Sequence, residues 1–360
     1  MGVRRAGKTV LARSLPGVRY LDCELPSTRA QVADPEAFLR SARGSTVALD
    51  EIHRLDQPSE LLKIAADHYP DVRILATGSS TLGASSRFRD TLAGRKSEVW
   101  LTPMTMEDLG DFGRADLRHR MLRGGLPEFF LAPEAPAAAI EEWVDAFWAR
   151  DILELFRLER RASFRRLFEL LMTHSGGIFE ATRFAKPCEA SRTTIANYLA
   201  VLEAALAVHV IRPYAEGGRA EIVSAPRVYG FDTGFVCHYR GISDIRPGDL
   251  GGLWEHLVLN ELHAHVGRAA IRYWRTKHGS EIDFVLVRPG RQPAAVECKW
   301  SSNDFDPAAM KIFRSAYPGG ASFVVTADTR DGQSYERSFG ALTARFVSVR
   351  DLVLRIQESL

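Results

Sequence analysis

The feature that most constrains the fold is a glycine-rich pattern in the first nine residues of the chain. The segment GVRRAGKT has the spacing G-x-x-x-x-G-K-[ST], which is typical of a phosphate-binding loop. Gly2 and Gly7 would let the backbone turn so that its N–H groups face phosphate oxygens. Lys8 would contact the β- and γ-phosphates, and Thr9 would offer its hydroxyl to Mg²⁺. Further backbone donors would come from the intervening residues, Val3, Arg4, Arg5 and Ala6.

A phosphate loop normally connects a buried strand to a helix, and here only Met1 precedes Gly2. We therefore expect either a start further upstream or a damaged nucleotide site. The helix that should follow, over residues 10–15, would direct the positive end of its dipole at the anion. The alternative is a coincidental Gly-Lys-Thr loop.

A second motif follows where a nucleoside triphosphatase needs it. Residues 46–49 can form a buried parallel strand, which ends in the paired acids Asp50 and Glu51. Asp50 would hold Mg²⁺ through water, and Glu51 would orient or deprotonate the attacking water. The alternative is a solvated acidic pair at the end of a strand.

Further polar residues follow a third strand, which is expected over residues 72–76. Thr77 or Ser79 could sense the γ-phosphate beside the acidic strand. Arg95 could reach a phosphate, in its own chain or from a neighbouring subunit, or could be a surface charge. The phosphate loop, the acidic strand end and the polar residues after the third strand follow one another as in P-loop ATPases. They predict an α/β P-loop ATPase domain with a parallel sheet over residues 1–120. The expected ligands are ATP and Mg²⁺.

Helical patterns occupy much of residues 121–240. Helices are expected over residues 140–161, 164–173 and 179–185, and from a cap at Ser191 onwards. A strand over residues 207–212 and a turn at Gly217-Gly218 would complete a connector with a winged helix-turn-helix.

The winged helix could engage DNA through polar residues of its last helix, namely Arg192, Thr193, Thr194 and Asn197. The pairs Arg160-Arg161 and Arg165-Arg166 could contact phosphates. The alternative is that the module serves only as an ATPase lid or a protein-docking surface.

Residues 241–360 hold a second constellation of polar residues. A helix over residues 252–265 carries Glu255, and strands are expected over residues 271–275, 281–287 and 294–300. This order of a helix and two strands, with the motif D…E-x-K at Asp283, Glu297 and Lys299, resembles the PD-(D/E)xK phosphodiesterases and the restriction-endonuclease-like folds. Glu261 and His265 on the same helix are expected to form a solvated pair.

The spacing of the D…E-x-K residues has a mechanical reason. Side chains two apart on a strand share a face, so Glu297 and Lys299 project together, and Asp283 can meet them from the paired strand. Asp283 and Glu297 would chelate Mg²⁺, Lys299 would activate the hydrolytic water, and Glu255 would complete the metal shell. The alternative is a structural charge network inside a docking domain.

The chain as a whole resembles the bacterial and archaeal AAA-type ATP-binding proteins with a C-terminal domain of unknown function. The resemblance rests on the segments GVRRAGKT, LDEI, TGSS, LAGR, GGLPE and GLWE, and it covers nearly the whole chain. It implies an AAA-type ATPase core and a winged helix between the two conserved parts.

Net charge, the cysteine pattern and the lengths of the apolar runs limit which other classes of function the chain can have. The net charge of +2 gives no global basic field, so DNA binding would need a local patch. The 4 cysteines form no C-x-x-C pair and are typical of reduced thiols. No apolar run approaches the ~20 residues of a membrane span, and the polar start has no signal peptide, so we expect a cytoplasmic protein.

These signals predict an ATPase that hydrolyses ATP with Mg²⁺ and is coupled to a nuclease-like domain that engages nucleic acid. A homo-oligomer is a further expectation, because ATPases of this fold often share an arginine between subunits. The alternative function is a nucleotide-sensing regulator or scaffold with little turnover and an inactive nuclease-like fold.

Overall fold

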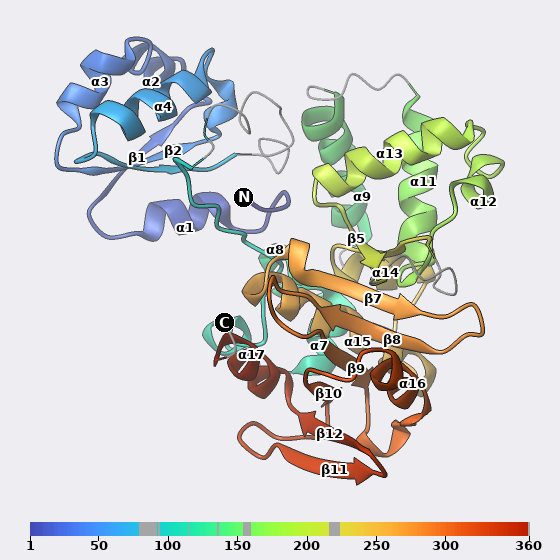
Figure 1. Ribbon diagram of the computed structural model, residues 1–360. Coiled ribbons are helices and arrows are strands. Elements are labelled where there is room, and N and C mark those ends of the chain that lie inside the picture. Colours follow the sequence, from blue (N-terminus) through green and yellow to red (C-terminus); the bar gives the residue numbers. More distant parts are fainter. Residues whose placement is uncertain are drawn as a thin grey trace. The chain divides into compact units, whose positions relative to one another are not determined.

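The structure is a computed structural model that describes residues 1–78, 92, 94–114, 116–134, 137–153, 160–215 and 224–358. The chain forms two compact units. The first unit contains Met1–Thr102, Glu141–Glu159 and Ala200–Ala207. The second contains Pro103–Ile140, Arg160–Leu199 and Val208–Leu360. Figure 1 shows the elements of each unit.

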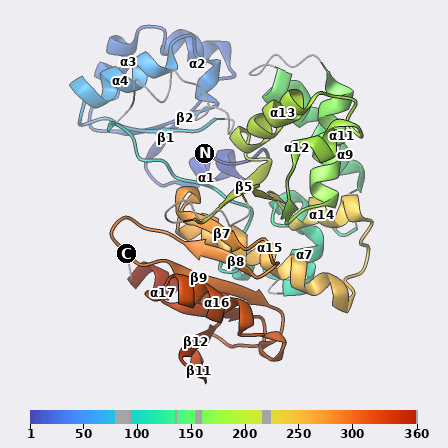
Figure 2. The same ribbon diagram turned by 45° about the vertical axis from the view of Figure 1, so that its right-hand side comes forward.

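The first unit is built on a three-stranded parallel sheet in the order β1-β2-β3. Its strands are β1 (Val18–Asp22), β2 (Thr46–Asp50) and β3 (Arg73–Ala76). The helices are α1 (Lys8–Ser14), α2 (Pro26–Gln31), α3 (Pro35–Ser41) and α4 (Pro58–His68), with the 3₁₀ turn η1 (Ile52–Arg54). Figures 1 and 2 show α2, α3 and α4 on one side of the sheet and α1 on the other. Val47 and Leu49 of β2 pack with Phe38 and Leu61 in the core, which is why β2 is so apolar.

The first residues of the chain pair with the segment 99–101. The Met1 amino group donates to Val99 O (2.5 Å), and Leu101 N donates to Met1 O (2.7 Å). Gly2 and Leu101 form a parallel bridge. Met1 therefore makes the hydrogen bonds of one residue of a parallel strand next to the phosphate loop.

The middle of the chain is mostly helical. Its helices are α6 (Asp108–Asp111), α7 (Leu117–Arg123), α8 (Pro127–Phe130), α9 (Ala137–Ala146), the π-helical turn η3 (Phe147–Ile152), α11 (Arg161–Thr173), α12 (Ala181–Ala185) and α13 (Arg192–Ala204). The predicted cap of α13 is confirmed, since Ser191 Oγ accepts from Thr194 N at 3.1 Å. The Gly217-Gly218 turn lies outside the described residues.

The described part of the helix predicted over residues 140–161 is helical, but it changes from α to π geometry. α9 ends at Ala146, and the π-helical turn η3 takes over from Phe147 to Ile152. The wider turn places the buried Asp151 beside Arg4, with 3.5 Å between carboxylate and guanidinium. Single π-turns of this kind occur inside α-helices and are frequent at functional sites. Residues 154–159 lie outside the described chain.

The second unit contains a nine-stranded mixed sheet in the order β11-β12-β10-β9-β8-β7-β5-β6-β4. Its strands are β4 (Gly177–Ile178), β5 (Val208–Pro213), β6 (Arg227–Gly230), β7 (Ile271–Arg275), β8 (Glu281–Leu286), β9 (Ala294–Lys299), β10 (Ser322–Thr326), β11 (Tyr335–Phe339) and β12 (Leu342–Val347). The strands predicted over residues 271–275, 281–287 and 294–300 thus form as β7, β8 and β9. β5 pairs with β7, so strands from the middle region and the C-terminal region share one sheet.

Helices accompany this sheet. They are α14 (Thr233–Arg240), α15 (Pro247–His265), α16 (Ala308–Ala316) and α17 (Val349–Glu358), with short 3₁₀ turns η5 (Arg268–Ala270) and η6 (Ser302–Asp304). Figure 2 shows β7, β8 and β9 side by side with α16 across them. Met310 and Phe313 of α16 pack against Trp274, Val285 and Val324 of the sheet. No helix in the described chain is long and apolar enough to cross a membrane.

A buried ion network fixes the turn after α7. Arg120 is 2% exposed, and its Nε and Nη2 donate to Met104 O at 3.0 and 2.8 Å. Asp232, 3% exposed, accepts from Gly125 N at 2.6 Å and from Gly234 N at 2.9 Å. Gly124 has a φ of 83°, and a Cβ atom there would lie 2.7 Å from Asp232 Cγ. The glycine pair of the GGLPE segment is therefore required by close approach of these side chains.

The prediction of a solvated pair at Glu261 and His265 is wrong. Glu261 is 3% exposed, and its Oε1 accepts from Met106 N at 2.7 Å. His265 Nε2 lies 3.8 Å from its other oxygen. Burial raises the pKa of Glu261 to about 7. The reason is that α15 is covered on most of its circumference, so even charged residues near its C-terminal end are enclosed.

This burial makes the stability depend on pH. The pKa of Glu261 is higher in the folded chain than its ordinary value of 4.5, so its stabilising effect is full below that value and is lost as the pH rises through about 7. We expect Glu261→Gln to gain about 3 kcal/mol in the free energy of unfolding relative to wild type between pH 4.5 and pH 8. Urea unfolding at both pH values measures this difference. Glu180→Gln, an exposed carboxyl, serves as the control, and an equal effect of both substitutions would contradict the prediction.

Candidate nucleotide site

The phosphate loop leads directly into α1. Gly7 caps the helix with a φ of 95°, a conformation that favours glycine. Lys8 Nζ donates to Gly2 O at 2.9 Å and to Val3 O at 2.8 Å. Burial lowers the pKa of Lys8, while the carboxylates of Glu51, Asp151 and Asp50 act in the opposite direction. The ammonium therefore lies inside its own loop, held by backbone oxygens that a phosphate could replace.

Asp50 joins the loop to the sheet. Its Oδ2 accepts from the Thr9 hydroxyl and from the Tyr20 hydroxyl, each at 2.7 Å. Its Oδ1 accepts from the Thr77 hydroxyl. Burial alone would raise the pKa of Asp50, but the hydrogen bonds from Thr77, Tyr20 and Thr9 outweigh burial and hold the pKa below its ordinary value. Asp50 is therefore an ionised carboxylate beside the loop threonine.

Glu51 follows with a strained backbone, because its φ of 51° and ψ of 45° are left-handed values that a non-glycine residue rarely adopts. Its Oε2 lies 3.2 Å from His53 Nδ1. Burial raises the pKa of Glu51, and the charge of Lys8 opposes this rise. Strained residues of this kind gather at functional sites. The structure thus brings together five predicted residues: Lys8, Thr9, Asp50, Glu51 and Thr77.

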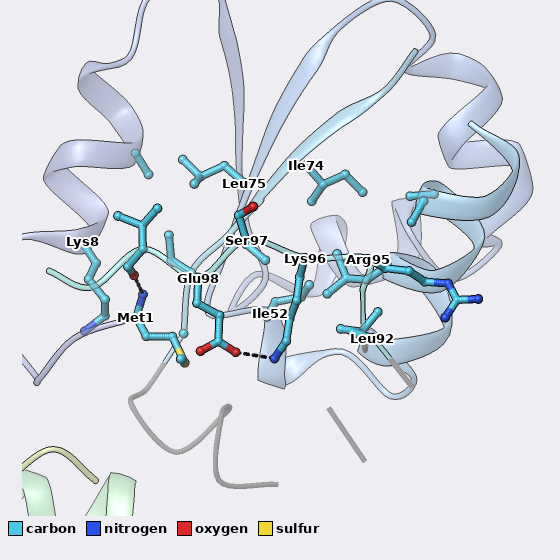
Figure 3. Close-up of a pocket in the computed structure, with 18 of the residues that line it drawn as sticks. Met1, Lys8, Ile52, Ile74, Leu75, Leu92, Arg95, Lys96, Ser97 and Glu98 are labelled. Carbon is cyan, nitrogen blue, oxygen red and sulfur yellow. Dashed lines mark hydrogen bonds and ion pairs between the residues drawn. The ribbon is translucent and has the colours of Figure 1, made fainter. Parts of the chain in front are cut away.

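Arg95 is not brought to this group in its own chain. Its Nε lies 2.7 Å from Asp67 Oδ1 at the surface. Figure 3 shows Lys8 and Arg95 at opposite ends of a cavity of about 430 Å³, which is lined mainly by apolar residues such as Ile74, Leu75 and Leu92. Lys8 and Thr77 of the predicted site line this cavity, whereas Asp50 and Glu51 do not. Ser79 lies outside the described residues.

The variable positions of the loop are held by residues of α9 and η3. Arg5 Nη2 lies 2.9 Å from Glu142 Oε1, and Arg4 Nη1 lies 3.5 Å from Asp151 Oδ2. Trp143 Nε1 donates to Arg4 O at 3.1 Å. Sequence reasoning missed these supports, because only their shared position in space links them to the loop.

The C-terminal residues predicted for catalysis also converge, from α15, β8 and β9. Asp283 Oδ2 accepts from Cys298 N at 2.8 Å, and Lys299 Nζ lies 3.0 Å from Glu297 Oε2. Burial, and then the carboxyl group of Asp283, raise the pKa of Glu297. Glu255 accepts from the Tyr229 hydroxyl. We call Glu255, Glu281, Asp283 and Glu297 the acidic cluster.

Arg227 of β6, which sequence reasoning missed, lies inside the acidic cluster. Its Nη2 is 2.8 Å from Glu255 Oε1, and its Nη1 is 2.7 Å from Glu281 Oε1 and 3.7 Å from Asp283 Oδ1. Its Nε donates to Gly176 O at 2.8 Å. Among the described residues, no three His, Cys, Asp or Glu side chains are arranged to hold a metal ion. In this arrangement the carboxylates of Glu255, Glu281 and Asp283 are paired with the guanidinium of Arg227.

The pKa values of two carboxyl groups in the acidic cluster, those of Glu255 and Glu297, are raised. Burial and the neighbouring Asp283 raise the pKa of Glu255 to about 7, and the same two causes raise the pKa of Glu297 well above its ordinary value. Burial alone would lower the pKa of Lys299, but Asp283 and Glu297 raise it. In the E-x-K motif, Glu297 therefore has a raised pKa and lies beside Lys299, whose raised pKa favours its charged form.

Three protein families match successive parts of the chain. Residues 1–110 match the family described as AAA domain. Residues 114–246 match a domain of unknown function, DUF8612, and residues 250–344 match another, DUF4143. The AAA match covers the loop, β2 and the acids that follow it.

Two solved structures share a weak likeness in fold. One is the ORC1 protein of Aeropyrum pernix in complex with DNA, with a TM-score of 0.26 and 15% identity over 67% of this chain and 85% of that one. The other is the signal transduction ATPase PH0952 of Pyrococcus horikoshii, with a TM-score of 0.27 and 11% identity over 73% of this chain and 44% of that one. Scores this low support no argument about function.

Two curated relatives from mycobacteria are much closer in sequence. The uncharacterized proteins Rv2008c of Mycobacterium tuberculosis and Mb2031c of Mycobacterium bovis are each 32% identical to this chain over 327 residues. The alignment covers 88% of this chain and 72% of each relative. This chain therefore belongs to the same AAA-domain protein family as the uncharacterized mycobacterial protein Rv2008c.

Proposed function

We propose that the N-terminal unit binds ATP with Mg²⁺ and hydrolyses it. The observation that carries this proposal is the 2.7 Å hydrogen bond from the Thr9 hydroxyl to Asp50, which joins the phosphate loop to the acidic end of β2. The AAA-domain match over residues 1–110 supports it. A coincidental loop would have no reason to meet a buried carboxylate that three hydroxyls hold in its ionised form.

Each residue of the site has its own role in this proposal. On ATP binding, Lys8 would exchange the carbonyls of Gly2 and Val3 for phosphate oxygens. Thr9 and Asp50 fit a Mg²⁺ ion, which would neutralise charge between the β- and γ-phosphates. Glu51, with its raised pKa, would accept a proton from the attacking water, and Thr77 would sense the γ-phosphate. Arg95 would act only from a neighbouring subunit, since its own chain pairs it with Asp67.

A second candidate function is nucleotide sensing with little turnover. It is favoured by Arg227, which fills the acidic cluster and leaves the C-terminal domain, over residues 241–360, with a structural charge network. In this alternative the domain over residues 121–240 transmits the nucleotide state. Nuclease activity of Glu255, Asp283, Glu297 and Lys299 stays a prediction.

We also propose that residues 161–230 form a winged helix. The order α11, β4, α12, α13, β5, β6, with β6 paired to both β4 and β5, supports this proposal. Arg192, Thr193, Thr194 and Asn197 lie at the start of α13, the helix that would face DNA. A protein-docking role would use the same helix without the phosphate contacts.

Phosphate release and thermal shift of the wild type distinguish ATP hydrolysis from nucleotide sensing, and a Glu51→Gln variant tests the proton acceptor. We expect the wild type to release phosphate from MgATP and MgATP to raise its melting temperature. Glu51→Gln should keep this thermal shift and lose about 100-fold or more in turnover, because only the proton acceptor is removed. Glu60→Gln, an exposed carboxyl on α4, is the control. A wild type that shows the shift without turnover would support nucleotide sensing, and the absence of both would refute nucleotide binding.

A further inference from the structure

A second cavity in the second unit, of about 420 Å³, has a cationic rim that the proposed function does not use. It is lined by residues of α11, β4, α12, β6, α14 and β7. Arg183, Arg240, Arg275 and His174 line it, and among the described lining residues there is no Asp or Glu. A partly open cavity with three arginines and no carboxylate among its described lining residues favours an anionic ligand.

The surrounding structure orients the side chains of Arg240, Arg275 and His174. Arg240 donates from Nε to Thr173 O at 2.9 Å and from Nη2 to Ser175 O at 2.7 Å, which fixes its guanidinium at the end of α11. Arg275 Nη1 lies 3.1 Å from Glu281 Oε2. Arg183 is an exposed residue of α12. His174 Nδ1 bonds to Leu170 O at 2.9 Å, so a ligand would meet its Nε2.

The rest of the wall is apolar and partly aromatic. Leu171, Ile178 and Val228 line it, together with Phe179 and Phe184, whose rings stack at 5.1 Å between centroids. A bare phosphate would leave this apolar surface unused. The volume matches a ligand that combines an anion with a flat organic body, because small-molecule sites usually measure about 300–1,000 Å³.

The cavity is separate from the acidic cluster. Val228 lies between Arg227 and Tyr229 on β6, so its side chain faces the side of the strand opposite to theirs. Arg275 connects the two sites through Glu281, which also pairs with Arg227. A ligand in the cavity would thus share an ion-pair network with the cluster without entering it.

We propose that this cavity binds a nucleotide by its phosphate and its base, either as a free monophosphate or as the 5′-phosphorylated end of a nucleic acid strand. Arg183, Arg240 and Arg275 contact the phosphate, and the apolar wall receives the base. The site is independent of the phosphate loop, so it can exist whether or not the N-terminal unit hydrolyses ATP.

The test uses the full chain with Lys8→Ala, which removes the lysine of the phosphate loop and leaves the cavity intact. Isothermal titration calorimetry with AMP, a 5′-phosphorylated tetranucleotide and its unphosphorylated counterpart identifies the ligand. We expect Arg183→Ala to weaken binding of the preferred ligand about tenfold, as for loss of one charge-assisted hydrogen bond. Lys186→Ala, an exposed cation of the same region that does not line the cavity, should change affinity less than twofold.

The outcomes separate the two sources of the nucleotide. Tighter binding of AMP assigns the free monophosphate, and tighter binding of the phosphorylated strand over its counterpart assigns the strand end. Failure of all three ligands to bind, or equal affinities of Arg183→Ala and Lys186→Ala, would overturn the proposal. Because the phosphate loop is disabled throughout, these results are independent of ATP hydrolysis by the wild type.

Discussion

Replacing Gly124 by alanine is expected to lower the free energy of unfolding by about 4 kcal/mol. Gly124 has a φ of 83°, and a Cβ atom there would lie 2.7 Å from Asp232 Cγ. Asp232 cannot move aside cheaply, because its oxygens accept from Gly125 N at 2.6 Å and from Gly234 N at 2.9 Å. Backbone strain and the loss of a buried hydrogen bond therefore add.

Gly251→Ala is the matched control for this substitution. Gly251 lies within α15, and a Cβ atom there would meet nothing within 4 Å. Alanine at this position should stabilise the chain by about 0.5–1 kcal/mol, because glycine has the greater freedom to lose on folding. Urea and thermal unfolding of both variants measure the contrast. Similar midpoints for the two variants would show that the turn after α7 is not held as the structure describes.

The second large effect is expected at Arg227. Arg227→Ala should destabilise the chain by about 3–5 kcal/mol, because the largely enclosed Glu255 then loses its ion-pair partner. Glu255 lies 2.8 Å from the guanidinium, and Glu281 lies 2.7 Å from it but keeps its ion pair with Arg275. The variant should also gain a Mg²⁺-dependent rise in melting temperature that the wild type lacks, because the cluster loses its internal counter-ion.

Two further variants check this explanation. Arg291→Ala, an exposed arginine, should change the free energy of unfolding by less than about 0.5 kcal/mol. Adding Glu255→Gln to Arg227→Ala should recover part of the lost stability, since one of the unpaired carboxylates is then neutral. A double variant as unstable as the sum of its single substitutions would show that the two residues do not interact. A Mg²⁺ response of the wild type equal to that of Arg227→Ala would show that Arg227 does not keep metal out.

Local patterns predicted much of the fold and part of the site. The phosphate loop and the acids after β2 are contiguous motifs, and the E-x-K strand has its own alternation, so Lys8, Asp50 and Glu297 could be located from sequence. The strands β7 and β9 were likewise predictable, because their runs of buried residues are flanked by turn residues. These features depend on neighbours along the chain.

Residues that act through distant partners could not be found in this way. Tyr20 lies 30 residues from Asp50, and Tyr229 lies 26 residues from Glu255. Arg227 occupies a short buried strand whose residues look ordinary until the sheet places it against the acidic cluster. Glu261 was wrongly predicted to be solvated, because the sequence of α15 does not distinguish an exposed face from a buried one. Burial by other elements decides such cases, and one helix or strand does not contain that information.

The hydrogen bonds of Met1 have a practical consequence for handling the protein. Its amino group donates to Val99 O, and its pKa is lowered first by burial and then by the charge of Lys8. Any residues before Met1, whether native or part of an engineered tag, would replace this amine by an amide and would enter beside the phosphate loop. Labels placed after α17 leave the chain at Met1 unchanged, so assays of nucleotide binding are best made with labels at that position.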